Sequence, residues 1–390
     1  MKAFALLAVA IMLGACGAGK TANGSPSPSN LPSLAATVTA TQTSAESPSP
    51  STSPTAAVPA LRLVYRTYDG SQYSIVAESA DGSDRVTLAG SNFAHPDLIR
   101  FIESRNRRWA AWADGGELRV AASQNLSSAT TVVTTSKSLV ALAVSDDGDS
   151  IAYEIHTTND PMTSAADLYI VHVHDRSVRL LREFAGPFIT CLGDAAFDTA
   201  AQRLMAVGCG SGQAAGLLLL SAVDGSIISE DDKFFAWPGQ WAFAADLKTV
   251  WLTVDGAAEG DIVRYDTATR TREVLYRSPV WRQSDGSAAP NLSGSLLSPD
   301  ETTLIFSRYT QDRAPEVYAL PSAGGTATMI FKSATFSTAG PWSPNGAYVA
   351  ILVDNSTPTQ RMRLVDPRTN AIIAVNTGAG FIEFLAWIVT

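Results

Sequence analysis

The sequence predicts an all-β protein: a seven-bladed β-propeller closed by its C-terminal strand, with a six-bladed ring as the alternative. A pair of short hairpins, WSPNGAYVAIL from Trp342 and RMRLVDPRTNAIIAV from Arg361, alternates apolar and polar residues as half-buried strands do. The same pair recurs along the chain, and each end of the repeat region carries only part of a unit. Four short strands repeated with a period in the forties are typical of a propeller.

The first strand of each unit is expected to end at an apolar residue followed by a turn. Six residues fit this position, with spacings by subtraction of 42, 53, 46, 54 and 45 residues. They are Ile102, Val144, Phe197, Phe243, Leu297 and Trp342.

The second hairpin of each unit follows the first in the same order. Its starting residues are Glu117, Asp167, Gly216, Asp261, Glu316 and Arg361. Each unit is therefore expected to form one small antiparallel sheet of four strands.

The two ends of the repeat region complement each other. Leu61 to Leu88 contains three strands and lacks an innermost one, whereas Phe381 to Thr390 is a lone strand. Trp387 lies 45 residues after Trp342, at the equivalent position. The last strand is expected to complete the first blade, which gives six complete blades and one shared blade without exposed sheet edges at the junction.

The turns carry a family resemblance. Ser298-Pro299-Asp300, Ser343-Pro344-Asn345-Gly346 and Ser145-Asp146-Asp147-Gly148 resemble the S-P-D-G turn of TolB-like and WD-like β-propellers. The units anchored at Ile102 and Phe197 depart from this motif, as does the one at Phe243. The resemblance covers about Leu61 to Thr390 and implies a rigid binding platform in the cell envelope, but no single chemistry. Six blades are usual in the TolB domain, hence the alternative count.

The N-terminal region is interpreted as an export signal followed by a tether. Residues 1–15 resemble a lipoprotein signal peptide, and Leu13-Gly14-Ala15-Cys16 resembles a bacterial lipobox, which implies lipid attachment at Cys16. Residues 16–59 are rich in Ser, Thr and Pro and are expected to form a disordered tether. Residues 60–390 form the propeller domain. The expected location is extracytoplasmic, with the chain lipid-anchored to the cell membrane.

Two classes of ligand are disfavoured. Residues 14–21 match the phosphate-loop pattern letter for letter, but this motif needs a strand before it and a helix after it, so nucleotide binding is not expected. The net charge is −9 without a basic cluster, which argues against nucleic acid. No cofactor is predicted.

Cysteine and histidine spacing suggests one disulfide and no metal site. A hairpin turning near Ala200 brings Cys191 and Cys209 nearly opposite, and an oxidising compartment favours a bridge between them, with two free thiols as the alternative. His172 and His174 share one face of a strand but lack a third ligand, so they are interpreted as surface residues.

A candidate binding site lies in the long loops that connect blades. Aromatic residues with a few charges suit a sugar or peptide. The alternative is that these rings only pack between blades or fill the central channel. The proposed ligand-binding residues are Phe188, Phe234, Trp237, Trp241, Trp281 and Arg282.

Two functions are considered first, and a third is a stability or assembly role with no small ligand. The first is a non-enzymatic binding or scaffold protein whose partner is an envelope protein or a polysaccharide. The second is an envelope glycan hydrolase or lyase with carboxylates at the channel mouth. The chain contains no G-x-S-x-G nucleophile motif and no sialidase-type Asp-box, so neither of those chemistries is expected. Three or more carboxylates and an arginine in one deep pocket would favour the enzyme, whereas a flat aromatic face would favour binding.

Overall fold

The structure is a computed structural model. It describes residues 61–69, 71–79, 83–91, 100–114, 116–156, 166–184, 191–209, 216–231, 241–255, 260–278, 292–309, 315–333, 337–353, 362–375 and 381–389. All of them belong to the compact unit Thr55–Thr390. Within these ranges, no helix has the length and apolar character needed to cross a membrane.

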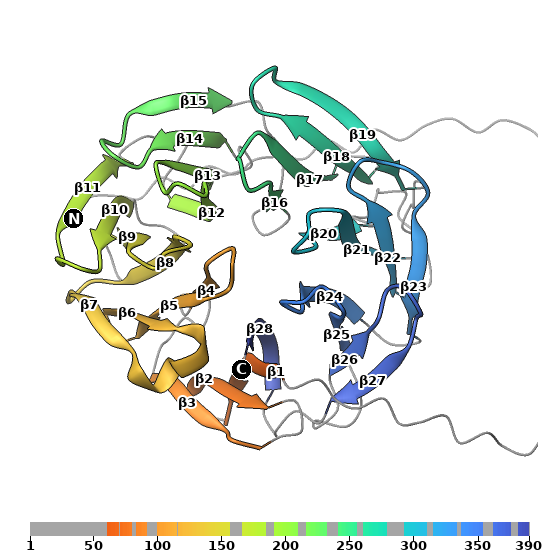
Figure 1. The fold of residues 1–390 in the computed structure, drawn as a ribbon, viewed down its shortest axis with the longest axis horizontal. Coiled ribbons are helices and arrows are strands. Elements are labelled where there is room, and N and C mark those ends of the chain that lie inside the picture. Colours follow the sequence, from red (N-terminus) through yellow and green to blue (C-terminus); the bar gives the residue numbers. More distant parts are fainter. Residues whose placement is uncertain are drawn as a thin grey trace, which may run out of the picture. The chain divides into compact units, whose positions relative to one another are not determined.

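The described residues form seven four-stranded antiparallel sheets arranged as the blades of a ring (Figure 1). The predicted seven-bladed propeller is therefore confirmed, and the six-bladed alternative is wrong.

Each blade runs from an innermost strand to an outermost one. In that order, the first three blades are β28 (Phe381–Val389), β1 (Leu61–Tyr68), β2 (Tyr73–Ser79) and β3 (Val86–Ser91); β4 (Phe101–Glu103), β5 (Trp109–Asp114), β6 (Glu117–Ala122) and β7 (Thr130–Thr134); β8 (Leu139–Val144), β9 (Ser150–His156), β10 (Ala166–His172) and β11 (Val178–Glu183). A 3-10 helix, η2 (Ser123–Ser128), joins β6 to β7.

The other four blades follow the same order. They are β12 (Cys191–Phe197), β13 (Arg203–Cys209), β14 (Leu217–Ser221) and β15 (Ile227–Asp231); β16 (Trp241–Phe243), β17 (Thr249–Asp255), β18 (Gly260–Asp266) and β19 (Thr271–Arg277); β20 (Leu292–Leu297), β21 (Thr303–Tyr309), β22 (Pro315–Pro321) and β23 (Thr328–Lys332); β24 (Ser337–Trp342), β25 (Val349–Val353), β26 (Met362–Val365) and β27 (Ile372–Val375).

The inner turn, which connects the first and second strands of a blade, repeats one hydrogen-bond scheme. In Ser298-Pro299-Asp300, the Ser298 hydroxyl donates to Asp300 Oδ1 at 2.5 Å and accepts from the N–H of Thr303 at 2.9 Å. Ser104 makes the equivalent bonds to Asn106 and Trp109, at 2.9 and 3.0 Å. The unit anchored at Ile102 therefore departs from S-P-D-G in its letters but keeps its Ser-x-Asn chemistry.

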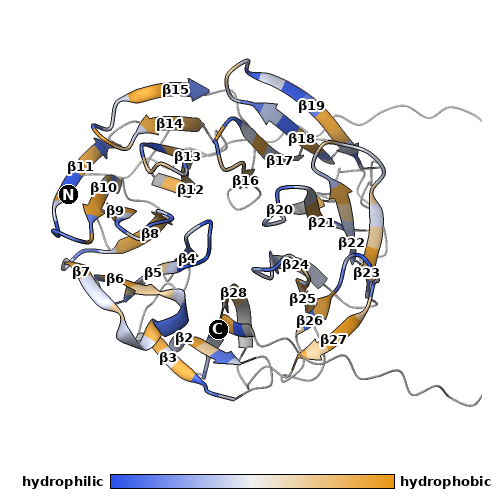
Figure 2. Cartoon of the chain, in the orientation of Figure 1, coloured by the Kyte–Doolittle hydropathy of each residue, from blue (hydrophilic) through white to orange (hydrophobic). Residues whose placement is uncertain are grey.

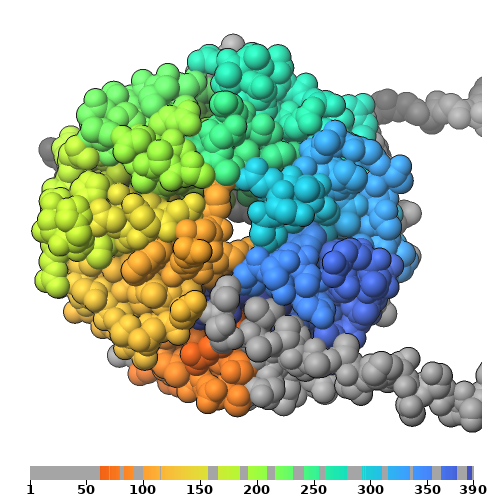
Figure 3. Space-filling view, viewed as in Figure 1, coloured from red at the N-terminus to blue at the C-terminus, as the bar shows by residue number. Residues whose placement is uncertain are grey.

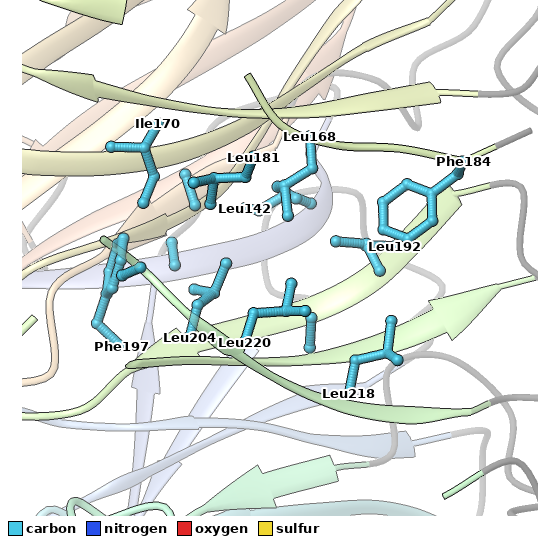
Figure 4. Packing of buried hydrophobic residues seen from close by; sticks show 14 of the residues in the cluster. Leu142, Leu168, Ile170, Leu181, Phe184, Leu192, Phe197, Leu204, Leu218 and Leu220 are labelled. Atoms are coloured by element: carbon cyan, nitrogen blue, oxygen red, sulfur yellow. The ribbon is translucent and has the colours of Figure 1, made fainter. Parts of the chain in front are cut away.

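Apolar side chains fill the space between neighbouring blades. Figure 4 shows one such cluster, in which Leu142, Leu168 and Ile170 of one blade meet Leu204 and Leu220 of the next. Leu168, Leu204 and Leu220 are fully buried. Figure 2 shows the corresponding pattern, with apolar residues along the strands and polar residues at the inner turns. Burial between blades is thus the main stabilising contact of the ring.

The C-terminal strand closes the ring as predicted. β28 pairs antiparallel with β1, and Trp387 lies opposite Leu63. The indole of Trp387 donates to the carbonyl of Pro341 at 2.8 Å, and the indole of Trp342 donates to the carbonyl of Leu296 at 3.1 Å. The two tryptophans therefore tie neighbouring innermost strands together in the same way, which explains their equivalent sequence positions.

Candidate functional site: the central channel

The innermost strands enclose a cavity of about 710 Å³, the central channel. Three of these strands, β12, β20 and β24, bulge where two residues face one on the partner strand. Each bulge begins with a glycine: Gly193, Gly294 or Gly340. Bulges re-aim side chains, and Asp194, within the β12 bulge, lies on the channel wall.

The inner turn between β4 and β5 bridges one end of the channel. Arg105 pairs with Glu301 at 3.1 Å and also donates to the carbonyls of Ala244 at 3.0 Å and Phe243 at 3.3 Å. Arg107 donates to the carbonyl of Trp342 at 2.5 Å. The two arginines of this turn therefore contact three other blades. Figure 3 shows that the side chains leave only a small opening at the centre of the ring.

Two residues of this bridge occupy a position where other turns have glycine. Arg107 and Glu301 have φ of 56° and 59°, and the equivalent Gly148 and Gly346 have 76° and 66°. A residue with a Cβ pays a conformational penalty in this left-handed region. Both side chains line the channel, so the strain coincides with a channel-facing charge.

The carboxylates at this end are held by hydrogen bonds. Glu301 Oε1 also accepts from the N–H of Ala245 at 2.7 Å. Asp198 accepts from the side chain of Arg203 at 2.9 Å and from the backbone N–H of Gln202 at 2.9 Å. Burial raises the pKa of Asp198, but these hydrogen bonds outweigh it and leave the pKa below its ordinary value. Both groups are therefore held as acceptors within the protein.

A second group of charged residues, Arg100, Asp194 and the buried Glu154, lies where three blades meet. Arg100 donates to the carbonyl of Gly193 and lies 3.8 Å from Asp194. Glu154, which is 1% exposed, accepts from the N–H of Leu192 at 2.7 Å. Burial raises the pKa of Glu154 to about 8, although the Leu192 hydrogen bond and the charge of Arg100 oppose the rise. Arg100 and Glu154 thus bind the backbone where the β12 bulge begins.

Glu103 is a carboxyl group on the channel wall with one buried oxygen that lacks a hydrogen bond within the described part of the chain. Burial raises its pKa to about 8, against the charge of Arg107 and a hydrogen bond from the backbone N–H of Trp387. Its Oε1 atom is shielded from solvent and has no hydrogen-bond partner among the described residues. Among the described residues, it is the only channel-lining carboxyl group with a solvent-shielded oxygen that has no hydrogen-bond partner.

Most residues of the aromatic site predicted from sequence lie outside the described residues: Phe188, Phe234, Trp237, Trp281 and Arg282. Trp241 is described. It lines the channel but is 7% exposed, packed against Met205 and Leu252. The predicted aromatic site therefore stays a prediction.

The two cysteines are direct partners in the β12–β13 register, so the predicted opposition is confirmed for the backbone. Cys16 lies outside the described residues.

His172 and His174 both approach Asp149, at 3.6 and 2.8 Å. Across the described ranges, no three or more His, Cys, Asp or Glu residues are placed to hold a metal ion.

Sequence reasoning missed Glu103, Arg105 and Arg107. The available signal was the run Arg105-Asn106-Arg107-Arg108 in an inner turn, where other units have proline and glycine.

No protein-family model and no curated protein matches the chain. Solved structures match its fold. An oligogalacturonate lyase in complex with manganese is 12% identical over 81% of this chain and 90% of the other, with a TM-score of 0.55. A periplasmic gluconolactonase of Pseudomonas aeruginosa is 14% identical over 84% and 99%, with a TM-score of 0.53. TolB of Acinetobacter baumannii is 12% identical over 83% and 81%, with a TM-score of 0.48. The resemblance to TolB-like propellers is confirmed as one of fold, and these identities show fold alone.

Proposed function

We propose that this TolB-like, seven-bladed β-propeller is an extracytoplasmic binding protein, lipid-anchored through Cys16, that admits part of its ligand into the channel. The ligand in this proposal is an envelope glycan or a group on an envelope protein. The observation that carries the proposal is the channel itself. Its volume of about 710 Å³ lies in the range of small-molecule sites, and its lining mixes apolar side chains with charged ones.

The number of carboxylates and arginines that line this one pocket favours an enzyme, whereas the way these carboxylates are bonded favours binding. A glycan hydrolase needs two carboxyl groups facing the substrate from opposite sides. In this channel Glu301 and Asp198 are occupied by Arg105 and Arg203, and nearby Glu154 by the backbone of Leu192. A rigid wall of paired charges is suited to recognition, because it presents fixed donors and acceptors without a reorganisation cost.

Binding in the channel can be tested by filling it. Ala195 lies on the channel wall, and Val178 lies on the outermost strand β11, where it is 50% exposed. A ligand found by screening glycans and envelope extracts against the wild type should lose at least tenfold in affinity with Ala195→Phe and nothing with Val178→Phe. Equal binding by both variants would place the ligand outside the channel.

Anchoring is tested separately by membrane fractionation. The wild type should remain with the membrane after a high-salt wash, because acyl chains and not charges hold it there. Cys16→Ser should release the chain to the soluble extracytoplasmic fraction. Retention of that variant on the membrane would contradict the lipid anchor.

The second candidate is an enzyme, as named for two of the fold neighbours, which are a lyase and a lactonase. Five carboxylates and four arginines line the channel, and a carboxyl group with a raised pKa such as Glu103 suits a general acid. Turnover of lactones or uronide oligomers that disappears in Glu103→Gln would establish this alternative.

A further inference from the structure

The β12 bulge places a charge on the channel wall that the bulge itself does not need. Gly193 and Asp194 together lie opposite the single residue Val207 of β13. The equivalent bulges in β20 and β24 carry Ser295 and Pro341 at the position of Asp194. A bulge re-aims the residues within it, and Asp194 lines the channel. The backbone geometry therefore does not explain why this residue is an aspartate.

Two charged side chains from other blades hold the bulge in place. Arg100, just before β4, donates to the carbonyl of Gly193. Glu154 of β9, which is 1% exposed, accepts from the N–H of Leu192 at 2.7 Å. The two residues that precede Asp194 are thus fixed from two neighbouring blades. A pre-organised wall loses little conformational freedom when a ligand binds, which is typical of a recognition site.

Arg100 and Asp194 form an ion pair that a ligand can bridge. Arg100 Nη1 lies 3.8 Å from Asp194 Oδ1, which is beyond hydrogen-bond distance, and the two side chains are 36% and 34% exposed. A polar contact of this length is commonly completed by a water molecule, and a ligand hydroxyl can take the same place. Such a hydroxyl donates to the carboxylate and accepts from the guanidinium, so it leaves the ion pair intact.

The charges around the channel balance, which disfavours a charged ligand. Five carboxylates and four arginines line it, and Arg203, outside the lining, pairs with Asp198 at 2.9 Å. Negative and positive groups are therefore equal in number. An anion at Arg100 would face the charge of Asp194, and a cation at Asp194 would face the charge of Arg100. Taking a charge out of water without an unopposed partner is costly.

We propose, resting on the function proposed above, that Arg100 and Asp194 bind adjacent hydroxyl groups of a neutral sugar at the β12 bulge. The pair lies where β4 and β12 begin, away from the inner turn that carries Arg105 and Arg107. The apolar side chains that also line the channel suit the C–H groups of a sugar ring.

The experiment is an NMR saturation-transfer titration of the folded protein at pH 7 with matched monosaccharides. The neutral probes are glucose, galactose, mannose and N-acetylglucosamine. Glucuronate and galacturonate are their anionic counterparts, and glucosamine and mannosamine are cationic ones. At least one neutral sugar should bind, and it should bind at least tenfold more tightly than its charged counterparts. Its affinity should change less than twofold between about 0.05 and 0.5 M salt, because screening acts on charged ligands.

Two variants locate the site. Asp194→Ser removes the carboxylate but introduces the residue type that the equivalent β20 bulge already carries, so the fold should be retained and the affinity for the neutral sugar should fall at least tenfold. Asp175→Ser is the matched control, because Asp175 is 51% exposed and does not line the channel; it should bind like the wild type. Should Asp194→Ser fail to fold, the comparison of neutral and charged sugars on the wild type still decides.

Several results would overturn the sugar site. They are no binding of any neutral sugar, a charged counterpart that binds as tightly or more tightly, and unchanged affinity in Asp194→Ser. A Ser- and Thr-rich peptide amide that displaces the sugar at lower concentration would assign the site to protein chains instead. A different ligand excluded by Ala195→Phe would overturn the sugar site and leave the general binding function intact. A neutral sugar that binds Ala195→Phe as well as the wild type would contradict both.

Discussion

At the residue scale, the fourth position of the inner turn shows how backbone strain and charge are combined. Gly148 and Gly346 adopt positive φ there, and so do Arg107, Ala201 and Glu301. Arg107 and Glu301 line the channel and bridge it, whereas Ala201 does neither. Backbone strain at Arg107 and Glu301 therefore accompanies a contact that bridges the channel. Backbone strain at Ala201 accompanies no such contact.

This difference predicts that Ala201→Gly stabilises the protein. The left-handed conformation costs a Cβ-bearing residue about 1–2 kcal/mol, and glycine loses about 0.5–1 kcal/mol of that in chain entropy. The net gain should be about 0.5–1 kcal/mol in the free energy of unfolding, measured by urea denaturation. Ala200→Gly, one residue earlier and without positive φ, serves as the control and should be neutral or destabilising.

Glu154 predicts a pH dependence of stability. Its folded pKa of about 8 lies above the ordinary value of 4.5, so the folded state holds a proton that the unfolded state has lost between these limits. The free energy of unfolding should therefore fall as pH rises from about 4.5 to 8, because over this range the unfolded state gains stability by releasing the proton. Glu154→Gln should match the wild type near pH 4 and be more stable by about 1–3 kcal/mol at pH 8. Parallel stability curves for the two proteins would contradict the buried neutral acid.

At the element scale, the β12–β13 hairpin is the clearest candidate for a covalent link. Cys191 and Cys209 are register partners. Cα atoms of antiparallel partners lie about 4.5–5.5 Å apart, which is within the range that disulfides span. The hairpin geometry thus permits the bridge that the sequence predicts.

The disulfide prediction concerns this hairpin alone. Protein isolated from an oxidising compartment should show a 191–209 linked peptide by non-reducing mass spectrometry. The loop is short, so reduction should cost about 2–3 kcal/mol in the free energy of unfolding. Cys191→Ser with Cys209→Ser should reproduce the loss and become insensitive to reductant. Two alkylatable thiols in the oxidised protein would refute the bridge.

At the scale of the whole ring, β28 holds the two ends of the propeller together. It pairs with β1, and Phe384 and Trp387 are buried against residues of both the first and the last blade. Opening the ring at this point exposes two sheet edges and the apolar side chains between two blades.

A chain ending at residue 380 should therefore lose cooperative unfolding, as followed by calorimetry, and should aggregate. A chain lacking residues 1–59 keeps every described strand and should unfold with the wild-type midpoint. Trp387→Ala, a graded version of the same lesion, should cost about 3–5 kcal/mol. A cooperative transition in the chain ending at residue 380 would show that closure is dispensable.

The sequence by itself determined the repeat, the blade count and the closure, because each follows from local alternation, turn residues and spacing. The anchors Val144, Phe197, Phe243, Leu297 and Trp342 are the last residues of their innermost strands, as expected. The Cys191–Cys209 register followed from hairpin counting for the same reason.

Only the tertiary structure decided which side chains meet in the channel. Glu103 and Arg107 belong to one hairpin and Trp342 to another blade, and their approach depends on how the blades curve around the axis and on the direction of one turn. None of these leaves a periodic trace in the sequence. Local physics specifies a blade, whereas a site at the axis depends on how all seven blades close around it.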